Sequence, residues 1–265
     1  MTKIESAISE IHSLDRLSDR NQWVNNIHPL VKLVLTVFYI AVTVSFPKYD
    51  ILGTLGMILY VLPLFILAEL SFFACLKRIW VVLPFVVLIG LANPVLDRIP
   101  VIIGGIRMTS GVLSMLTLII KGIFTVLASY ILIATTSIEK ICYALRLIHV
   151  PKIIVTQLML TYRYITVLMA EVNRITCAYS LRAPGQKGVH FKVWGSLTGQ
   201  LLLRSIDRAN TVYESMTLRG YKGDFSYIGG KTKFRILDAV FLFIWAGIII
   251  LLRIKPIYVL LGGIG

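Results

Sequence analysis

Long runs of apolar residues alternate with shorter polar segments along most of the chain. Five of these runs are at least close to the length that a helix needs to cross a bilayer core, roughly 20 residues at a rise of about 1.5 Å per residue. They cover residues 28–46, 51–68, 79–96, 108–138 and 236–252. The pattern therefore predicts an all-α, polytopic membrane protein with about five transmembrane helices.

A more polar stretch separates the fourth apolar run from the fifth. Residues 139–235 have the pattern of three helices, of which the first is short and ends before Pro151, the second runs from about 152 to 182 and the third from about 195 to 219. Residues 4–17 repeat apolar side chains at helical spacing and predict a short amphipathic surface helix. We divide the chain into an N-terminal cytoplasmic segment (1–27), four membrane helices (28–138), a three-helix region with two long crossing helices (139–235), and a last span with its tail (236–265).

The composition supports burial in a membrane. Of the 265 residues, 57% are hydrophobic and 15% are charged, which is too apolar for a soluble domain. The N-terminus is charged throughout and lacks the apolar core of a cleaved signal peptide, so we expect insertion to depend on the internal spans.

The charge pattern bears on the topology. The net charge is +14, and residues 139–235 hold 15 of the 27 Lys and Arg against five Asp and Glu. If the apolar run 153–170 also crossed the bilayer, the basic residues after it would lie opposite the other basic segments, against the tendency of Lys and Arg to stay inside. If it does not cross, 21 of the 27 share one face. We therefore expect five spans and a cytoplasmic N-terminus, with six spans as the alternative. Basic residues at this face suit lipid or an acidic partner, and we expect no nucleic acid.

Two of the helices in the polar region end alike. Their ends are Leu181-Arg182-Ala183 and Leu218-Arg219-Gly220, and Pro184 follows the first motif while the second ends in a glycine. One interpretation is capping, because a cation in the last turn faces the negative end of the helix dipole. The other is docking, because an arginine at the tip of a long helix can grip a partner's carboxylate with its planar fork.

The chain resembles the transmembrane T subunit of energy-coupling-factor (ECF) transporters, in the cobalt-type branch called CbiQ. The similar stretches include "IHPLVKLVLT", "ANPVLDRIPV", "ALRLIHVPKIIVTQLMLTYRYI", "LRAPGQKG" and, most specifically, "LLLRSIDRANTVYESMTLRGYKGDF". In that family, short Ala-Arg-Ser or Ala-Arg-Gly motifs end two cytoplasmic coupling helices. Here they fall on Leu181-Arg182-Ala183 and Leu218-Arg219-Gly220, with Leu in place of the first Ala in both and Ala183 after the first Arg.

The resemblance implies a non-catalytic coupling subunit of an importer for cobalt or nickel ions in a bacterial or archaeal cell membrane. Its implied partners are two ABC-type ATPases, which the arginines of the two motifs contact, a membrane subunit that captures the metal, and a small accessory membrane subunit. The ATPases, and not this chain, would hydrolyse ATP. The T subunit would transmit their motion to the capture subunit.

The residues themselves predict no catalytic or metal site and no cofactor. The histidines are scattered and the cysteines lack metal-ligand spacing. Gly230-Lys231-Thr232 looks like part of a phosphate loop, but the earlier glycine that such a loop requires is Phe225.

Lys121 lies near the middle of the fourth apolar run. An ionisable group there costs on the order of 3 kcal/mol and usually faces protein or water. We consider it a candidate for an intramembrane coupling contact, with snorkelling to the surface as the alternative.

A membrane-embedded enzyme acting on an anionic, lipid-linked substrate is the rival function. It would need acids or histidines clustered at one helix end. Asp207 and Glu214 share a helical face but lie beside Arg204 and Arg208, as solvated pairs do.

Overall fold

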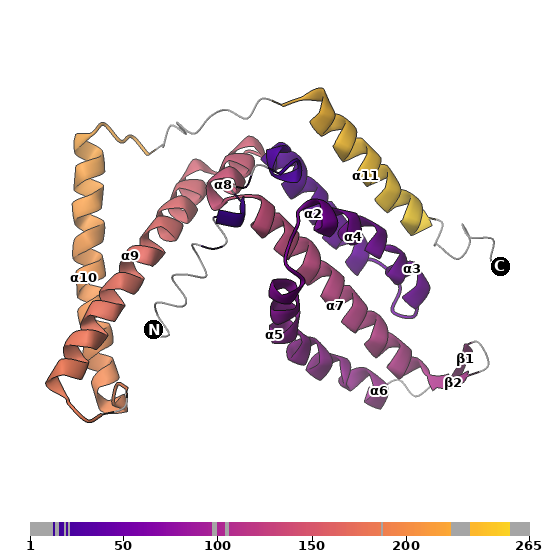
Figure 1. Ribbon diagram of the computed structural model, residues 1–265, viewed down its shortest axis with the longest axis horizontal. Coiled ribbons are helices and arrows are strands. Elements are labelled where there is room, and N and C mark those ends of the chain that lie inside the picture. The colour runs from indigo at the N-terminus through magenta and orange to yellow at the C-terminus, as the bar shows by residue number, and fades with distance from the viewer. Residues whose placement is uncertain are drawn as a thin grey trace. The chain divides into compact units, whose positions relative to one another are not determined.

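The computed structural model describes residues 13, 16–18, 20, 22–96, 100–103, 106–186, 188–223 and 234–254. Most of them are helical, which confirms the predicted all-α class (Figure 1). The chain forms two compact units, described separately below. The apolar unit comprises Asp15–Ser137 and Thr232–Gly265, and the hairpin unit comprises Met1–Leu14 and Ile138–Lys231. The predicted surface helix over 4–17 lies mostly outside the described residues.

The apolar unit is built around one long helix, α7, which packs against α2, α3, α4, α5 and α6. Helix α11 lies along α2 (Figure 1). The elements in chain order are η1 (Val24–Asn26), α2 (Pro29–Val44), α3 (Ile51–Gly56), α4 (Ile58–Leu67), α5 (Phe72–Gly90), α6 (Ala92–Leu96), β1 (Pro100–Ile103), β2 (Ile106–Thr109), α7 (Ser110–Thr135) and α11 (Ile236–Ile254).

Several boundaries differ from the sequence prediction. The second apolar run is divided at Met57 into α3 and α4. Helix α5 begins at Phe72 rather than at 79, because the Ser71 hydroxyl accepts a hydrogen bond from the Ala74 N–H and caps the helix there. The segment before α7 contains two short antiparallel strands, in which Pro100 pairs with Thr109 and Ile103 with Ile106. The β-branched residues of this segment favour strands.

Four helices in the described part of the chain are long and apolar enough to cross a membrane. They cover Phe73–Pro94, Ser110–Thr135, Lys152–Arg182 and Ile236–Ile254, while Pro29–Val44 and Ile51–Leu67 are shorter apolar helices. At about 1.5 Å per residue, the 16 residues of α2 extend roughly 24 Å, somewhat less than a bilayer core. Length and composition do not distinguish the five-span from the six-span arrangement, so the topology stays a prediction.

Both ends of α2 are held by charged side chains of neighbouring helices. At the N-terminal end, the buried carboxylate of Asp238 accepts from the backbone N–H of His28, the N-cap of α2, and from that of Arg235. At the other end, Lys121 Nζ donates to the carbonyls of Val44 (3.2 Å) and Phe46 (2.6 Å). An acid at a helix N-terminus and a cation at its C-terminus both complement the helix dipole.

Aromatic rings fill the space between α2, α4 and α11. The rings of Tyr39 and Tyr60 stack at 4.4 Å between centroids, and Trp245 meets Tyr60 edge-on at 5.3 Å. The buried Tyr39 hydroxyl donates to the carbonyl of Met57, where α3 ends. A buried hydroxyl needs a hydrogen-bond partner, and the Met57 carbonyl supplies one. The bond therefore holds the junction of α3 and α4 against α2.

The hairpin unit contains α8 (Ile138–Leu147), α9 (Lys152–Arg182) and α10 (Phe191–Leu218). The predicted bounds of α9 are confirmed. Helix α10 begins four residues before the predicted start, because the His190 side chain accepts from the Lys192 N–H as an N-cap. Helices α9 and α10 run in opposite directions and cross one another (Figure 1).

Candidate functional site

The end of α10 is closed by backbone hydrogen bonds. Tyr221 N–H donates to the carbonyl of Met216, and Gly220 N–H donates to that of Thr217. These two bonds form a Schellman cap, which requires a left-handed residue directly after the helix. Gly220 supplies it with φ of +85°, and this explains a glycine at this position. Arg219 is the C-cap residue and lies just outside the helix.

The end of α9 is built differently, although its sequence is similar. Arg182 is the last helical residue, and Ala183 is the C-cap with a negative φ. Its N–H donates to the Tyr179 carbonyl, and the Tyr179 hydroxyl donates to the side chain of Gln186 at 2.7 Å. The bend that follows contains Gly185, whose φ is +93°. The two predicted motifs therefore share residue types but not backbone geometry.

Arg182 and Arg219 share one property. Both side chains are exposed, and neither makes a hydrogen bond or ion pair with any residue that the structure describes. Backbone groups close the two helix ends instead. The guanidinium groups are therefore available to a partner, and capping does not account for them.

Because α9 and α10 are antiparallel, the two arginines lie at opposite ends of the helix pair. Arg182 is at the end where the loop joins the helices, and Arg219 is at the far end of α10. The 28 residues of α10 extend about 42 Å at the usual helical rise. The pair of helices thus presents two cations separated by roughly 40 Å.

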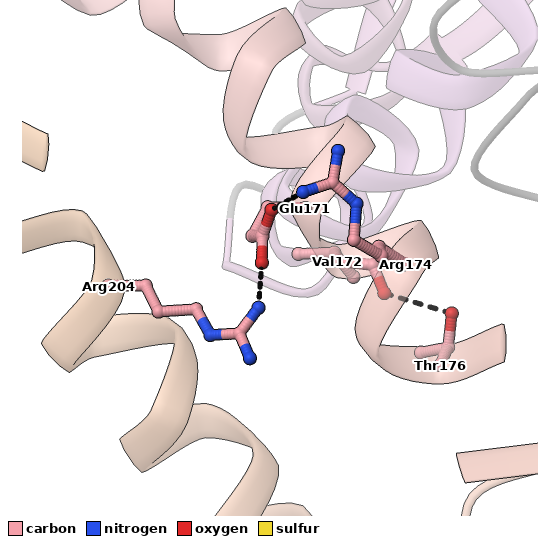
Figure 2. Close-up of polar contacts among 5 residues, drawn as sticks. All are labelled: Glu171, Val172, Arg174, Thr176 and Arg204. Atoms are coloured by element: carbon pink, nitrogen blue, oxygen red, sulfur yellow. Dashed lines mark hydrogen bonds and ion pairs between the residues drawn. The ribbon is translucent and has the colours of Figure 1, made fainter. Parts of the chain in front are cut away.

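Glu171 links the two helices where they cross. Its carboxylate accepts a hydrogen bond from Arg204 of α10 and one of 3.0 Å from Arg174 of its own helix (Figure 2). The hydrogen bond from Arg204 lowers the pKa of Glu171 below its ordinary value, and the nearby charge of Arg174 acts in the same direction.

An open apolar groove of about 490 Å³ lies between the first half of α9 and the second half of α10. Leu160, Tyr164 and Leu168 line it from α9, and Val212 and Met216 line it from α10. Helix α10 has no buried residue. The hairpin unit therefore leaves much apolar surface uncovered.

The small residues of α10 do not all lie against α9. A side chain added at Gly199 would meet nothing within 4 Å. Ser205 and Ala209 line the groove between the two helices. In this structure, α9 and α10 make contact through long side chains such as those of Glu171 and Arg204.

Lys121 is not free in the membrane part. Its two hydrogen bonds cap the C-terminal end of α2, and Arg253 donates to the neighbouring Ser45 carbonyl at 3.3 Å. The converse contact is made by the buried Lys32 of α2, which donates to the carbonyl of Thr135, the last residue of α7, at 2.7 Å. Each helix thus supplies a lysine that caps the other, and no pattern in the sequence singles out Lys32 for this contact. A coupling role for Lys121 stays a prediction.

The described residues contain no group of three or more His, Cys, Asp or Glu side chains placed to hold a metal ion. Cys75 and Cys142 are buried, and Cys177 is exposed. All three are free thiols.

The sequence was compared with known proteins. A protein of Methanocaldococcus jannaschii described as uncharacterized is 28% identical over 110 residues, which cover 41% of this chain and 37% of that protein. The chain thus matches little more than a third of that relative's length. Residues 20–228 match the family model CbiQ, described as cobalt transport protein. Since this match spans most of the 265 residues, the chain belongs to the CbiQ cobalt transport protein family, the T subunits of ECF transporters.

Proposed function

We propose that this protein is the coupling subunit of an importer for cobalt or nickel ions, and that Arg182 and Arg219 dock two ABC-type ATPases. One observation carries the proposal: two exposed arginines, whose side chains make no polar contact with any described residue, lie at opposite ends of a pair of long helices. Two attachment points roughly 40 Å apart suit two partner subunits better than one.

The proposed mechanism follows from this separation. Each ATPase subunit holds one end of the hairpin unit through an acidic group that grips the guanidinium. When ATP binding brings the ATPases together, the two ends receive forces in different directions. Crossing helices that are joined near their middle, here by the ion pair of Glu171 with Arg204, convert such forces into a change of crossing angle. The chain passes this motion to the capture subunit, which binds the metal ion.

The partners and location belong to the same proposal. We place the protein in a bacterial or archaeal plasma membrane with its N-terminus and hairpin unit in the cytoplasm. The proposed partners are the two ATPases, a metal-binding membrane subunit that captures the ion, and a small accessory membrane subunit. The chain itself performs no catalysis.

Charge reversal tests the docking. The full chain is purified with the ABC-type ATPases of the same genome, and Arg182→Glu and Arg219→Glu are compared with wild type. Each reversal should weaken assembly by about a hundredfold or more, because it places two negative charges together at an interface. Metal uptake in cells should fall with it, while the amount of protein in the membrane stays unchanged.

Arg163→Glu is the matched control. Arg163 is an exposed arginine of α9 that lies away from both helix ends, and it should leave assembly unchanged. If Arg182→Glu and Arg219→Glu both assemble and transport like wild type, the docking proposal is wrong. Activity on a lipid-linked substrate would then become the function to examine.

A further inference from the structure

The apolar side chains of the hairpin unit are most exposed at its ends. Among the large apolar residues described between 138 and 223, the four with the highest exposed fraction are Leu218 (89%), Phe191 (89%), Leu181 (83%) and Ile153 (76%). Each of them is the first, second, penultimate or last residue of α9 or α10. Elsewhere on these helices the large apolar side chains are more covered.

These four residues fall into two pairs, one beside each arginine. Leu181 precedes Arg182 at the end of α9, and Phe191 begins α10 after the connecting loop. Leu218 precedes Arg219 at the end of α10, and Ile153 lies at the start of α9, where it lines the same groove as Tyr221. Each end of the helix pair therefore combines one free cation with two exposed apolar side chains, one from each helix.

This combination differs from an ordinary solvated helix end. Such ends normally carry polar residues, and a leucine left in water forgoes the free energy that burial would supply. Interfaces, by contrast, place apolar anchors and arginine together, with the apolar groups excluding water from the charge pair. The region from 139 to 235 has an excess of ten positive charges, so the partner surface is expected to be acidic.

We propose that each end of the hairpin unit is a composite docking surface, in which the leucine before the arginine enters an apolar pocket of the ATPase beside the acidic group that binds the guanidinium. This inference rests on the proposed function and adds a second, uncharged determinant to it. The arginine mainly sets attraction and orientation. The leucine sets how long the complex lasts.

The test uses Leu181→Gln and Leu218→Gln in the full chain, with the ABC-type ATPase pair of the same genome as the binding partner. Glutamine keeps a similar size and helix propensity but resists burial. Each variant should bind the ATPases about tenfold to a hundredfold more weakly, which corresponds to the loss of one buried leucine. The loss should appear as faster dissociation, and the dependence of binding on salt should match that of wild type.

Leu203→Gln provides the matched control. Leu203 lies in the middle of α10, is 65% exposed and lines neither the groove nor the Glu171 contact. It should bind like wild type. Circular dichroism of all three variants should show the same helix content.

The outcomes separate this inference from the proposed function. If the two end variants bind like wild type while Arg182→Glu and Arg219→Glu do not, the apolar pocket is refuted and the docking arginines stand. If Leu203→Gln weakens binding as much as the end variants, the effect does not belong to the ends and the inference is also refuted. If neither the leucine nor the arginine variants matter, both proposals are wrong.

Discussion

Lys121→Met removes the cation that closes the C-terminal end of α2 while retaining an unbranched side chain of similar length. The Lys121 ammonium group donates to the Phe46 carbonyl at 2.6 Å and to the Val44 carbonyl at 3.2 Å. Hydrogen bonds from charged donors contribute about 1.5 to 3 kcal/mol each, and a cation at a helix C-terminus adds up to about 1 kcal/mol.

The net loss should be smaller than the sum of these contributions. Arg253 still donates to the neighbouring Ser45 carbonyl at 3.3 Å, so the C-terminal end of α2 keeps one cation. We therefore expect the free energy of unfolding to fall by about 1 to 3 kcal/mol. For a chain of this size, that corresponds to a melting temperature lower by about 2 to 10 °C.

The assay is thermal unfolding of the detergent-solubilised protein, followed by tryptophan fluorescence. Trp245 is a suitable reporter, because its ring packs against Tyr60 between α4 and α11. Lys77→Met is the control, since Lys77 is an exposed lysine of α5 for which the structure shows no hydrogen bond within the described residues. It should melt like wild type.

Two results would contradict this reasoning. If Lys121→Met melts at the wild-type temperature, the two hydrogen bonds do not stabilise α2. If it melts normally but abolishes metal uptake with the ATPases still bound, Lys121 acts as the intramembrane coupling contact that the sequence suggested. A joint loss of stability and uptake supports the capping role.

Two further predictions concern helix contacts. Gly122→Ala should lower the free energy of unfolding by about 1 to 2 kcal/mol, because the new methyl group would lie 3.2 Å from Val86 of α5. Gly247→Ala is the control, because nothing lies within 4 Å of the new methyl group, and it should be neutral or stabilising in the same thermal assay. A loss at both positions would contradict the assignment to packing against Val86, because alanine favours a helix more than glycine does. The Glu171 pKa is lowered in the folded protein, so its carboxylate stays ionised at a pH where an ordinary glutamate is already protonated. The contact of Glu171 with Arg204 should therefore be lost only when the pH falls through this lowered pKa. The distance between spin labels on α9 and α10, followed against pH, measures this transition. A transition at the ordinary glutamate pKa would contradict the pairing of Glu171 with Arg204, and so would a transition that is unchanged in Glu171→Gln.

The long elements of this fold were predictable from the sequence, because each has a strong local signal. Pro151 fixed the start of α9, and its predicted end at Arg182 agrees with the structure. The shorter features were not predictable in the same way. The break at Met57 depends on a contact with Tyr39, which lies 18 residues earlier, and the hydropathy of a continuous apolar run does not show it.

The charged contacts inside the apolar unit were the main omission. Lys32 and Asp238 lie at the ends of predicted spans, where charged residues are ordinary, and the sequence does not say which helix end they meet. Their partners are 103 and 210 residues away in the chain. Such pairing follows from how helices pack, which a single sequence does not specify.

The two arginines illustrate why similar sequences can hide different structures. Both motifs read Leu-Arg followed by a small residue, and both could be explained as caps. The structure closes one end through Gly220 and Tyr221, and the other through Ala183 and Tyr179, with Arg182 inside its helix and Arg219 outside. If capping were the reason for the arginines, the two ends would be expected to use them in the same way. Within the described residues neither arginine side chain makes a polar contact, so the motifs share an exposed leucine beside an exposed guanidinium, a combination that suits a partner surface.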